Sequence, residues 1–516
     1  MKEHAFFERS LPAVEGVRAS DLAELYRYLE DPALGLHSFM AVRHGKVIAE
    51  AWWNPYAPEK PHTLFSASKS FTGLAVGLAA EDGLLSLTDK VVSFFPERLP
   101  ARTGEYMEKM TVKDLLTMST GFAKDPHDFP WPRPDDVNGT GAHCCHAGIE
   151  LPLIDWIRGF FDHYVAYEPG TEFVYSTEAS YMLSAIVQKA VGCTVSEYLN
   201  RKMFIPMGIG EPFWEESPDG VSCGGWGLML TTEELAAVGQ MMLNGGVFNG
   251  RRILPEAYIR DATSPHVSTA HLGRPFCNGY GYQIWLDDRE GTYMFQGAFG
   301  QILAVIPGKD MVLSYTSGAN RPERDKVWNH IWELLLDRVD KEPAKEAEAE
   351  KRDQAELNRL TAGMKIPAAK GKPSWEMPEK AVYSGREYLL GDNRLNFSMF
   401  SMKFAGNPGE TDRLTMEVPE GRFTVPVGYG CFAQGKTCVP TEKTDTDVSV
   451  VFESVSCSGA WTDKGYHLIL CFDETSYINE MMVEFTPGGI KLHHSRICSF
   501  YPAVNAFLTG VEDRTE

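Results

Sequence analysis

Phe65-Ser66-Ala67-Ser68-Lys69-Ser70-Phe71 opens a run of small and apolar residues that predicts a helix over 68–82, closed by Gly83. A Ser-x-x-Lys at the start of a helix places the serine hydroxyl and the lysine amine one turn apart on the same face. The positive potential at a helix N-terminus favours negative charge that develops at the serine. A lysine held beside a hydroxyl in a partly dry site can lose its proton and act as a base. The spacing alone is weakly specific, but its place at a strand-turn-helix junction favours Ser66 as a nucleophile and Lys69 as its base.

The residues on both sides of this stretch predict alternating helices and strands. Apolar residues at helical spacing predict helices over 20–31, 111–119 and 178–191. Two β-rich runs within 39–52 meet at Arg43-His44-Gly45-Lys46, which predicts a hairpin, and residues 278–318 predict at least three strands separated by glycine turns. Gly73 and Gly77 would weaken the helix over 68–82, so close packing in the protein centre is their expected role.

The composition changes sharply near residue 340. Residues 339–360 are rich in Glu, Lys and Ala and predict a solvated helical connector, and the Lys/Pro/Gly-rich stretch 363–378 is the expected joint. Short strands and turns from about 380 to 510 predict a separate all-β domain, either a barrel or a sandwich. We therefore expect a first domain over 1–340, a connector and linker over 341–378, and an all-β accessory domain over 379–516.

Composition narrows the classes of function. The chain has 516 residues, with 49 Lys and Arg against 70 Asp and Glu, so its formal net charge is −21. No basic stripe is present to neutralise phosphates, which argues against nucleic-acid binding. The 43% hydrophobic fraction excludes wholesale disorder, and no apolar run approaches the length of a membrane-spanning helix. The charged opening Met1–Arg9 does not resemble a signal peptide, so we expect a cytoplasmic protein without a membrane partner.

Cysteine and histidine patterns give little support for a metal site. Ten cysteines in 516 residues are too sparse for a disulfide scaffold. The cluster His143-Cys144-Cys145-His146 invites a zinc interpretation, but adjacent residues rarely converge on one ion. His493-His494 followed by Cys498 is weaker still. We expect no metal and no organic cofactor.

Several further motifs, in order along the chain, carry a resemblance to a known family. They are Asp82-Gly-Leu-Leu-Ser-Leu-Thr-Asp-Lys-Val91, Thr111-Val-Lys-Asp-Leu-Leu-Thr-Met-Ser-Thr-Gly121, Glu168-Pro-Gly-Thr-Glu-Phe-Val-Tyr-Ser176, Gly224-Gly225 ahead of Thr231-Thr-Glu-Glu-Leu235, and Gly297-Ala-Phe-Gly-Gln301 leading to Val305-Ile-Pro307. Together with the Ser-x-x-Lys, residues 10–335 resemble the serine β-lactamase and penicillin-binding-protein-like superfamily, in its class C-like branch. The resemblance implies an α+β fold, the β-lactamase/DD-peptidase-like fold, with an antiparallel sheet flanked by helices and a helical subdomain.

The resemblance implies catalytic roles for three residues. Ser66 matches the family nucleophile, Lys69 its partner base, and Tyr175 the tyrosine of the Tyr-x-Asn motif, where a phenol can move a proton between serine and leaving group. A core tyrosine at a helix start is the structural alternative for Tyr175. Thr177 stands where the family usually has asparagine, which puts its role in orienting an amide substrate in doubt.

The last motif departs from the family pattern more strongly. Many members carry a Lys-Thr-Gly strand whose cation receives a substrate carboxylate, but Tyr293–Gln301 contains no cation. It is similar to the Gly-x-x-Gly-Gln version in family VIII esterases and 6-aminohexanoate-oligomer hydrolases. That similarity implies an oxyanion hole made by the backbone N–H groups of Ser66 and Ala298, with Gly297 beside the substrate. The glycines could instead be simple turn glycines, and Trp226 is either a wall of the cleft or a buried core residue.

Other residues give weaker expectations. The irregular segment Ala123–Glu150 would overhang the cleft in this fold, and Tyr164 or Tyr167 could assist in amide hydrolysis. In the all-β domain, three aromatic residues could line a pocket, although core packing is the favoured interpretation. The overhanging segment offers His127, Trp131, His143 and His146, and the three aromatic residues of the all-β domain are Trp375, Trp461 and Tyr477.

The predicted function is a serine hydrolase that cleaves an ester or a small amide bond through an acyl-enzyme on Ser66. Alternatives within enzymes are an acyltransferase of the same fold and a β-lactamase or D-amino-acid peptidase. A catalytically degenerate binding or sensor protein is the alternative from another class. The missing cation and the acidic charge favour a neutral or cationic small-molecule substrate, and a homo-oligomer stays open.

Overall fold

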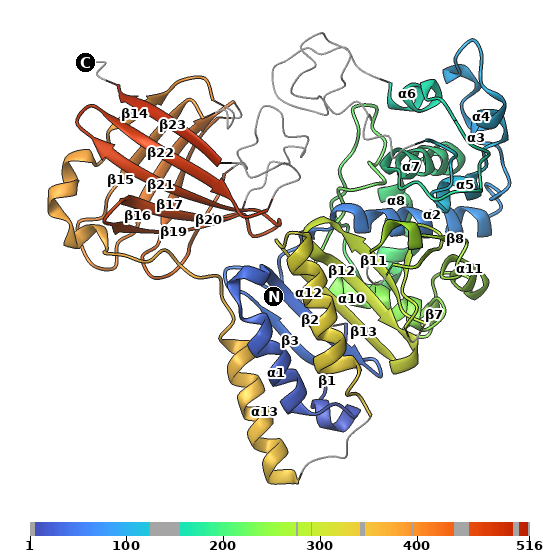
Figure 1. Ribbon diagram of the computed structural model, residues 1–516, viewed down its shortest axis with the longest axis horizontal. Coiled ribbons are helices and arrows are strands. Elements are labelled where there is room, and N and C mark those ends of the chain that lie inside the picture. Colours follow the sequence, from blue (N-terminus) through green and yellow to red (C-terminus); the bar gives the residue numbers. More distant parts are fainter. Residues whose placement is uncertain are drawn as a thin grey trace.

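The computed structural model describes residues 6–123, 155–274, 277–289, 291–340, 346–393, 397–419, 421–437, 454–498 and 505–513. In these residues a mixed sheet carries helices on both faces, and a second, antiparallel sheet lies beside it (Figure 1). The fold is therefore the predicted α+β fold with a C-terminal all-β domain. His127, Trp131 and the cluster His143–His146 lie outside the described residues.

The first sheet contains nine strands among the described residues. Strands β1 and β3 run parallel and every other neighbouring pair runs antiparallel. In spatial order they are β1 (Glu8–Arg9), β3 (Lys46–Trp52), β2 (Leu36–Arg43), β13 (Met311–Ser317), β12 (Gln301–Ile306), β11 (Tyr293–Gly297), β10 (Trp285–Leu286), β9 (Gly279–Tyr280) and β8 (Val267–Ser268). The hairpin predicted within 39–52 is confirmed as β2 and β3, and the strands predicted within 278–318 are confirmed as β9 to β13.

The helices of the described residues are α1 (Ala19–Leu29), α2 (Ser68–Glu81), α3 (Val91–Phe94), α4 (Glu105–Lys109), α5 (Val112–Leu116), α6 (Trp156–Asp162), α7 (Thr177–Val191), α8 (Val195–Leu199), α9 (Ile205–Met207), α10 (Thr232–Leu243), α11 (Glu256–Ala262), α12 (Arg321–Ile331) and α13 (Ala347–Ala362). Several of them cover the two faces of the sheet, whereas α3, α4 and α6 lie away from the strands (Figure 1). Residues of β12 alternate between two cores: Leu303 packs with α2, α7 and α10, and Ile302 packs with α1, α12 and α13. None of the described helices is long and apolar enough to cross a bilayer.

Most of the predicted helices are confirmed, and one is too long. The chain forms α1, α2 and α7 where apolar periodicity places helices. The helix predicted over 111–119 ends at Leu116, because Met118 adopts a positive φ of 56° and turns the chain. Its start is well defined, since Thr111 and Asp114 form a reciprocal capping box.

Close approach explains the glycines of α2. A Cβ on Gly73 would lie 2.9 Å from the carbonyl oxygen of Tyr282, and one on Gly77 would lie 2.3 Å from the ring of Tyr258. The Tyr258 hydroxyl donates a hydrogen bond to the Gly73 carbonyl, which fastens α11 to α2. The predicted close packing at these two positions is confirmed.

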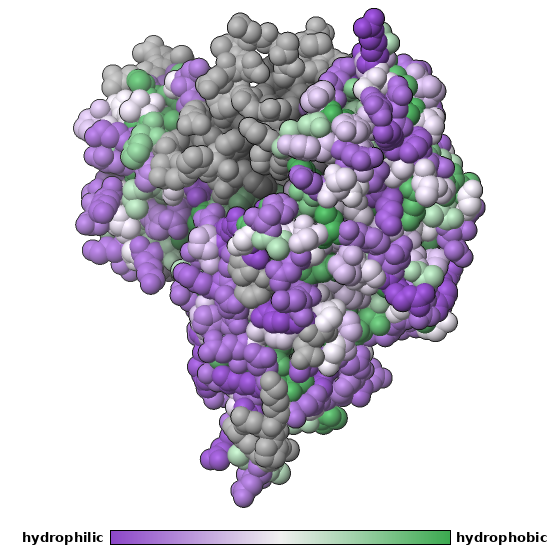
Figure 2. Space-filling model, turned by 45° about the vertical axis from the view of Figure 1, so that its right-hand side comes forward, coloured by the Kyte–Doolittle hydropathy of each residue, from purple (hydrophilic) through white to green (hydrophobic). Residues whose placement is uncertain are grey.

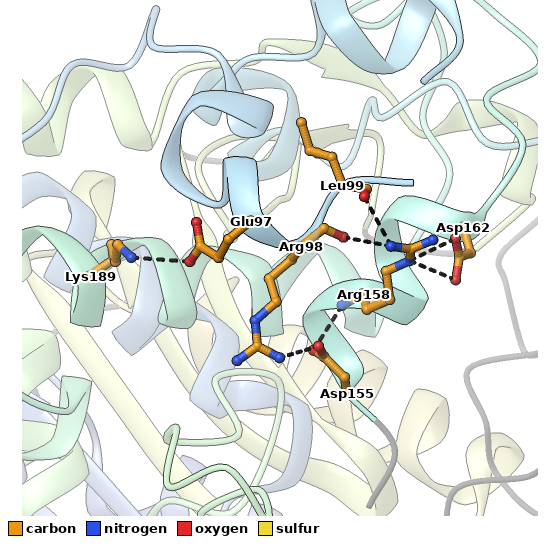
Figure 3. A network of polar contacts seen from close by, with 7 residues as sticks. All are labelled: Glu97, Arg98, Leu99, Asp155, Arg158, Asp162 and Lys189. Carbon is orange, nitrogen blue, oxygen red and sulfur yellow. Dashed lines mark hydrogen bonds and ion pairs between the residues drawn. The ribbon is translucent and has the colours of Figure 1, made fainter. Parts of the chain in front are cut away.

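Polar contacts hold the start of α6, which directly follows the segment 124–154 (Figure 3). Asp155 caps the helix by accepting a hydrogen bond of 3.0 Å from the backbone N–H of Arg158, and it forms an ion pair with Arg98. The Arg158 guanidinium in turn donates to the Leu99 carbonyl at 2.9 Å. These contacts join the start of α6 to residues 98–99, which follow α3 in the chain.

The predicted connector is helical but not fully solvated. Helix α13 packs along α1, as Figure 1 shows, and buries Leu357 and Leu360 in the core that α1 and β12 share. An ion pair of 2.7 Å between Arg27 and Glu356 reinforces this contact. Because most residues of α13 are charged, the composition of this segment did not indicate that one of its faces is apolar and buried.

The C-terminal sheet has ten strands among the described residues, and all neighbours are antiparallel. In spatial order they are β17 (Gly421–Val427), β16 (Asp412–Val418), β15 (Met399–Lys403), β14 (Glu387–Leu390), β23 (Asn505–Glu512), β22 (Gly489–Arg496), β21 (Ile478–Thr486), β20 (Gly465–Cys471), β19 (Val455–Thr462) and β18 (Ala433–Gly435). A bridge between Gly428, which follows β17 at one end of this order, and Ser458 of β19, the strand next to the other end, brings the two ends together. The domain is thus a nearly closed, barrel-like sheet and not a sandwich of two sheets.

Much of the surface is hydrophilic, as the net charge of −21 leads one to expect. In Figure 2 charged and polar residues dominate the coloured face, and hydrophobic residues are scattered over it. Isolated apolar residues of this kind are normal on soluble folds.

Candidate active site

Three serines stand at the start of α2, and their surroundings differ. The Ser68 hydroxyl is buried and accepts a hydrogen bond of 3.1 Å from the Leu228 N–H. The Ser70 hydroxyl is buried and donates to the Gln283 carbonyl. Ser66 lies in the 3-10 turn η3 (Phe65–Ala67) and keeps partial exposure. Of the three, Ser66 therefore has the hydroxyl that an incoming molecule can reach.

Lys69 is 2% exposed and directs its amine toward Ser66. Its Nζ donates a hydrogen bond of 3.2 Å to Ser66 Oγ and another of 2.7 Å to the carbonyl of Gly225. The same Nζ lies 5.1 Å from the ring centroid of Tyr175, which stacks on Trp285 with a centroid separation of 5.7 Å. The structure thus brings the hydroxyl, the amine and the phenol ring together, although they are spread over 110 residues of sequence.

Gly224 and Gly225 are wedged between α2 and α7. A Cβ on Gly224 would lie 2.6 Å from the Ser180 carbonyl of α7, and one on Gly225 would lie 2.7 Å from the Thr177 methyl and 3.3 Å from Lys69 Nζ. Thr177, at the first position of α7, and Lys69 thus both lie beside Gly225, while a role of Thr177 in substrate binding stays a prediction. The glycine pair lets the chain pass close enough to orient the Lys69 amine.

Trp226 follows this pair and is partly buried. Its indole N–H donates a hydrogen bond of 2.9 Å to Glu215, and its carbonyl accepts one of 2.8 Å from Trp214. The ring also lies 6.0 Å from Trp156. These contacts show a packed residue at the site's periphery, while a role as a wall of the cleft stays a prediction.

The end of β11 lies against the residues that precede Ser66. A Cβ on Gly297 would lie only 2.1 Å from the Leu64 carbonyl oxygen, so this approach requires glycine. Ala298 then begins the turn η7 (Ala298–Gly300), which contacts η3. The two backbone segments that carry the predicted oxyanion-hole donors, Ser66 and Ala298, are therefore adjacent.

Gln301, the last residue of the Gly-x-x-Gly-Gln motif, is completely buried and holds this turn. Its side-chain amide donates to the carbonyls of Ala298 at 3.0 Å and Ser317 at 2.8 Å. The Ser476 hydroxyl of the C-terminal domain lies 2.8 Å from the same nitrogen, so three acceptors share its two N–H hydrogens. These contacts explain structurally why the motif ends in glutamine, which could not be inferred from its position in the sequence.

One charged residue near the site is absent from the sequence predictions. The Arg274 guanidinium lies 5.3 Å above the ring of Trp285, the same ring that stacks on Tyr175. Burial, followed by repulsion from Arg321, lowers the pKa of Arg274. Burial also raises the pKa of Tyr280, with a smaller contribution from Tyr175. No cation lies in 293–301, as predicted, but a neighbouring segment supplies one, and no local motif signals it.

The remaining candidates fall into two groups. In the C-terminal domain Trp461 and Tyr477 are buried in the core, as favoured, and Trp375 is half-buried against Tyr429. Tyr164 and Tyr167 are exposed, and their assistance in catalysis stays a prediction. Within the described ranges no group of three or more His, Cys, Asp or Glu side chains is arranged to hold a metal ion.

Comparison with protein families gives a match that covers most of the first sheet and its helices. Residues 34–336 match the family described as Beta-lactamase. The 6-aminohexanoate-dimer hydrolase of Paenarthrobacter ureafaciens is 25% identical over 338 residues, which are 62% of this chain and 81% of that protein. The lovastatin esterase of Penicillium rubens is 28% identical over 162 residues, which cover 28% of this chain and 37% of the esterase.

A solved structure shows the same fold. The structure titled EstCE1, a hydrolase with promiscuous acyltransferase activity, superposes with a TM-score of 0.50 and 17% sequence identity. The superposition covers 61% of this chain and 98% of that structure.

Proposed function

This chain belongs to the beta-lactamase family and is a serine hydrolase, and from that premise we propose that it cleaves an ester or a small amide bond through an acyl-enzyme on Ser66. The observation that carries the proposal is the 3.2 Å hydrogen bond between Lys69 Nζ and Ser66 Oγ, opposite the adjacent Gly297–Ala298 segment. The names of two relatives, a 6-aminohexanoate-dimer hydrolase and a lovastatin esterase, support hydrolysis of such a bond.

In the proposed first step, Ser66 Oγ attacks the substrate carbonyl carbon while its proton passes to the neutral amine of Lys69. The carbonyl electrons move onto the oxygen, which the backbone N–H groups of Ser66 and Ala298 stabilise. As the tetrahedral intermediate collapses, the bond to the alcohol or amine breaks. The leaving group takes the proton from Lys69 through the phenol of Tyr175, which lies over the same amine.

In the proposed second step, water attacks the acyl-enzyme. The Lys69 and Tyr175 pair removes a proton from the water, the same N–H groups stabilise the oxyanion, and the proton returns to Ser66 Oγ as the acid leaves. Thr177 and Gly297 lie where they would border the substrate, because they flank Lys69 and the oxyanion turn respectively. The proposal uses no metal and no cofactor.

The test is labelling by a fluorophosphonate, followed by intact mass spectrometry, on the wild type and Ser66→Ala. We expect one adduct on the wild type and none on the variant, with turnover reduced about 10⁴-fold or more. Ser68→Ala is the matched control, since Ser68 is buried two residues away, and it should keep the adduct. An undiminished adduct on Ser66→Ala would remove Ser66 as the nucleophile, and an unlabelled, inactive wild type would favour the degenerate binding protein.

A substrate panel separates the remaining enzyme alternatives. p-Nitrophenyl esters, D-amino-acid amides and a chromogenic cephalosporin distinguish esterase, peptidase and β-lactamase activity, and an added alcohol detects acyl transfer. The panel should include anionic esters, because the half-buried Arg274 counts against the predicted preference for neutral or cationic substrates. Fast cephalosporin turnover without ester cleavage would overturn the proposed bond type.

We also propose the division into residues 1–340, 341–378 and 379–516. Its support is the change from the mixed sheet to the barrel-like sheet, although α13 packs on the first part.

A further inference from the structure

Among the described residues of the C-terminal domain, the turn of residues 472–477, which joins β20 to β21, packs beside the proposed active site. Its backbone accepts hydrogen bonds from the first domain: Thr63 N–H donates to the Glu474 carbonyl at 2.9 Å, and the Tyr56 hydroxyl donates to the Thr475 carbonyl at 3.2 Å. Asp473, whose side chain is buried, forms an ion pair with Lys60. The turn is therefore docked on the segment that leads into Ser66.

Two residues with unusual backbone conformations flank the proposed oxyanion hole. Phe65, directly before Ser66, has a φ of 47°, and Phe299, directly after Ala298, has a φ of 58°. A bulky side chain disfavours the left-handed region, so such a conformation persists only where the surroundings hold it. The Ser66 N–H belongs to the peptide unit that joins Ser66 to Phe65, and Ala298 is bonded directly to Phe299. A shift of either phenylalanine would therefore move the backbone segment that carries the neighbouring donor.

The ring of Tyr477, at the end of the docked turn, contacts both phenylalanines. Phe65 and Phe299 meet edge to face at 5.3 Å, and Tyr477 lies edge to face against them at 6.2 Å and 6.1 Å respectively. Tyr477 is 4% exposed, and the guanidinium of Arg496 covers its ring at 4.6 Å. One side chain of the C-terminal domain thus supports both halves of the proposed oxyanion hole.

Ser476, the preceding residue, makes a second connection to the same turn. Its hydroxyl donates a hydrogen bond of 2.8 Å to the Ser317 carbonyl and accepts one of 2.8 Å from Gln301. Gln301 in turn holds the Ala298 carbonyl. Ala298 is thus connected to the C-terminal domain in two ways, by the hydrogen bonds through Gln301 and by the aromatic contact of its neighbour Phe299.

We propose that Tyr477 and Ser476 are positioning residues, through which the C-terminal domain holds the Ser66 and Ala298 N–H groups in the geometry that stabilises the oxyanion. The inference rests on the proposed function. It assigns to the barrel-like domain a part in catalysis without any contact to substrate. It predicts a loss in transition-state stabilisation, and not in substrate binding, when the aromatic support is removed.

The test compares Tyr477→Leu with Tyr477→Phe in the full-length chain, using the best p-nitrophenyl ester. For Tyr477→Leu we expect kcat to fall about 10- to 100-fold while KM changes less than about threefold, because the donors are misplaced after binding. An arylboronic acid, which forms a tetrahedral adduct with a serine, should bind Tyr477→Leu more weakly in proportion to the loss of kcat/KM. Tyr477→Phe keeps the ring and should restore both values.

Tyr388→Leu is the matched control, since Tyr388 is a buried tyrosine of the same sheet that packs on Phe485. We expect both Tyr388→Leu and Tyr477→Leu to unfold at a lower temperature than the wild type, but Tyr388→Leu should keep kcat and boronate affinity. Equal losses of kcat in both variants, or an unchanged kcat in Tyr477→Leu, would overturn the proposal.

If Tyr477→Leu does not fold, Ser476→Ala replaces it. We expect a fall in kcat of about 3- to 10-fold at constant KM, and a kcat equal to that of the wild type would overturn the proposal. The outcome for Ser66→Ala separates the two ideas. Turnover by Ser66→Ala contradicts the proposed function, whereas an inactive Ser66→Ala beside a fully active Tyr477→Leu contradicts only the positioning role.

Discussion

The two sides of Ser66 are built in different ways. On the proposed proton-transfer side, Lys69 comes from α2, Thr177 begins α7 and Tyr175 lies two residues before it, with Gly225 between the helices. On the proposed oxyanion side, Phe65 and Phe299 hold left-handed conformations in two short turns, against Tyr477 of the C-terminal domain. All residues of the first side lie within residues 34–336, which match the family, whereas Tyr477 of the second side lies outside this range.

The difference follows from the rigidity of the backbone that carries each group. A helix of 14 or 15 residues such as α2 or α7 is held by its own hydrogen bonds and by a broad buried face. A turn of three residues with an unfavourable φ has neither, so contacts from outside must keep its geometry. Changes on the two sides should therefore differ in what they affect: proton transfer on one and oxyanion stabilisation on the other.

The largest effect is expected for Lys69→Met on the proton-transfer side. Methionine keeps the unbranched shape of the lysine but cannot take the Ser66 proton, so kcat/KM should fall about 1,000-fold. Lys202→Met, on the surface, is the control. A loss of less than tenfold in the steady-state rate would show that Lys69 is not the base.

A smaller effect, but one that separates the two sides, is expected for a pair of glycine variants. In Gly297→Ala the new Cβ meets the Leu64 carbonyl at 2.1 Å, and backbone must move, so kcat should fall about 100-fold and arylboronic acid affinity with it. In Gly225→Ala the nearest atom is the Thr177 methyl at 2.7 Å, and a side chain can yield, so a loss of about tenfold is expected. Equal losses of boronate affinity in both variants would contradict the comparison.

The smallest effect on activity is expected for His62, which lies on the oxyanion side just before the turn η3. His62 and His37 share a buried hydrogen bond of 3.1 Å, and burial lowers the pKa of His62 to about 4. The folded state favours the neutral form of His62. The contribution of His62 to the free energy of unfolding is therefore fully present above the unfolded pKa of about 6.5 and is lost as the pH falls toward 4. At pH 5 the loss from His62 should be about 2 kcal/mol.

His62→Asn should therefore lose less stability than the wild type between pH 7 and pH 5, as measured by urea unfolding. His271→Asn, which removes an exposed histidine, is the control. A wild type and a His62→Asn variant with the same dependence on pH would show that His62 does not titrate in this range.

Local pattern was sufficient for much of the fold. The small-residue helix after Ser66, the hairpin at Gly45 and the helix closed by Gly192 could all be predicted, because periodicity and capping act over a few neighbouring residues. The helix over 111–119 was predicted too long, since nothing in its composition signals the positive φ of Met118. The choice between barrel and sandwich depended on strand pairing across the whole domain, which composition does not contain.

The sequence by itself determined which chemical groups are present: a Ser-x-x-Lys, a following tyrosine, paired glycines and an acidic chain. Only the tertiary structure decided which serine is exposed, that Arg274 lies beside the Trp285 ring, and that Gln301 and Tyr477 meet around one turn. The physical reason is the range of the forces. Helix capping and hydrophobic periodicity act between near neighbours, whereas burial, aromatic contacts and hydrogen bonds between domains join residues up to 419 positions apart only after the chain has folded.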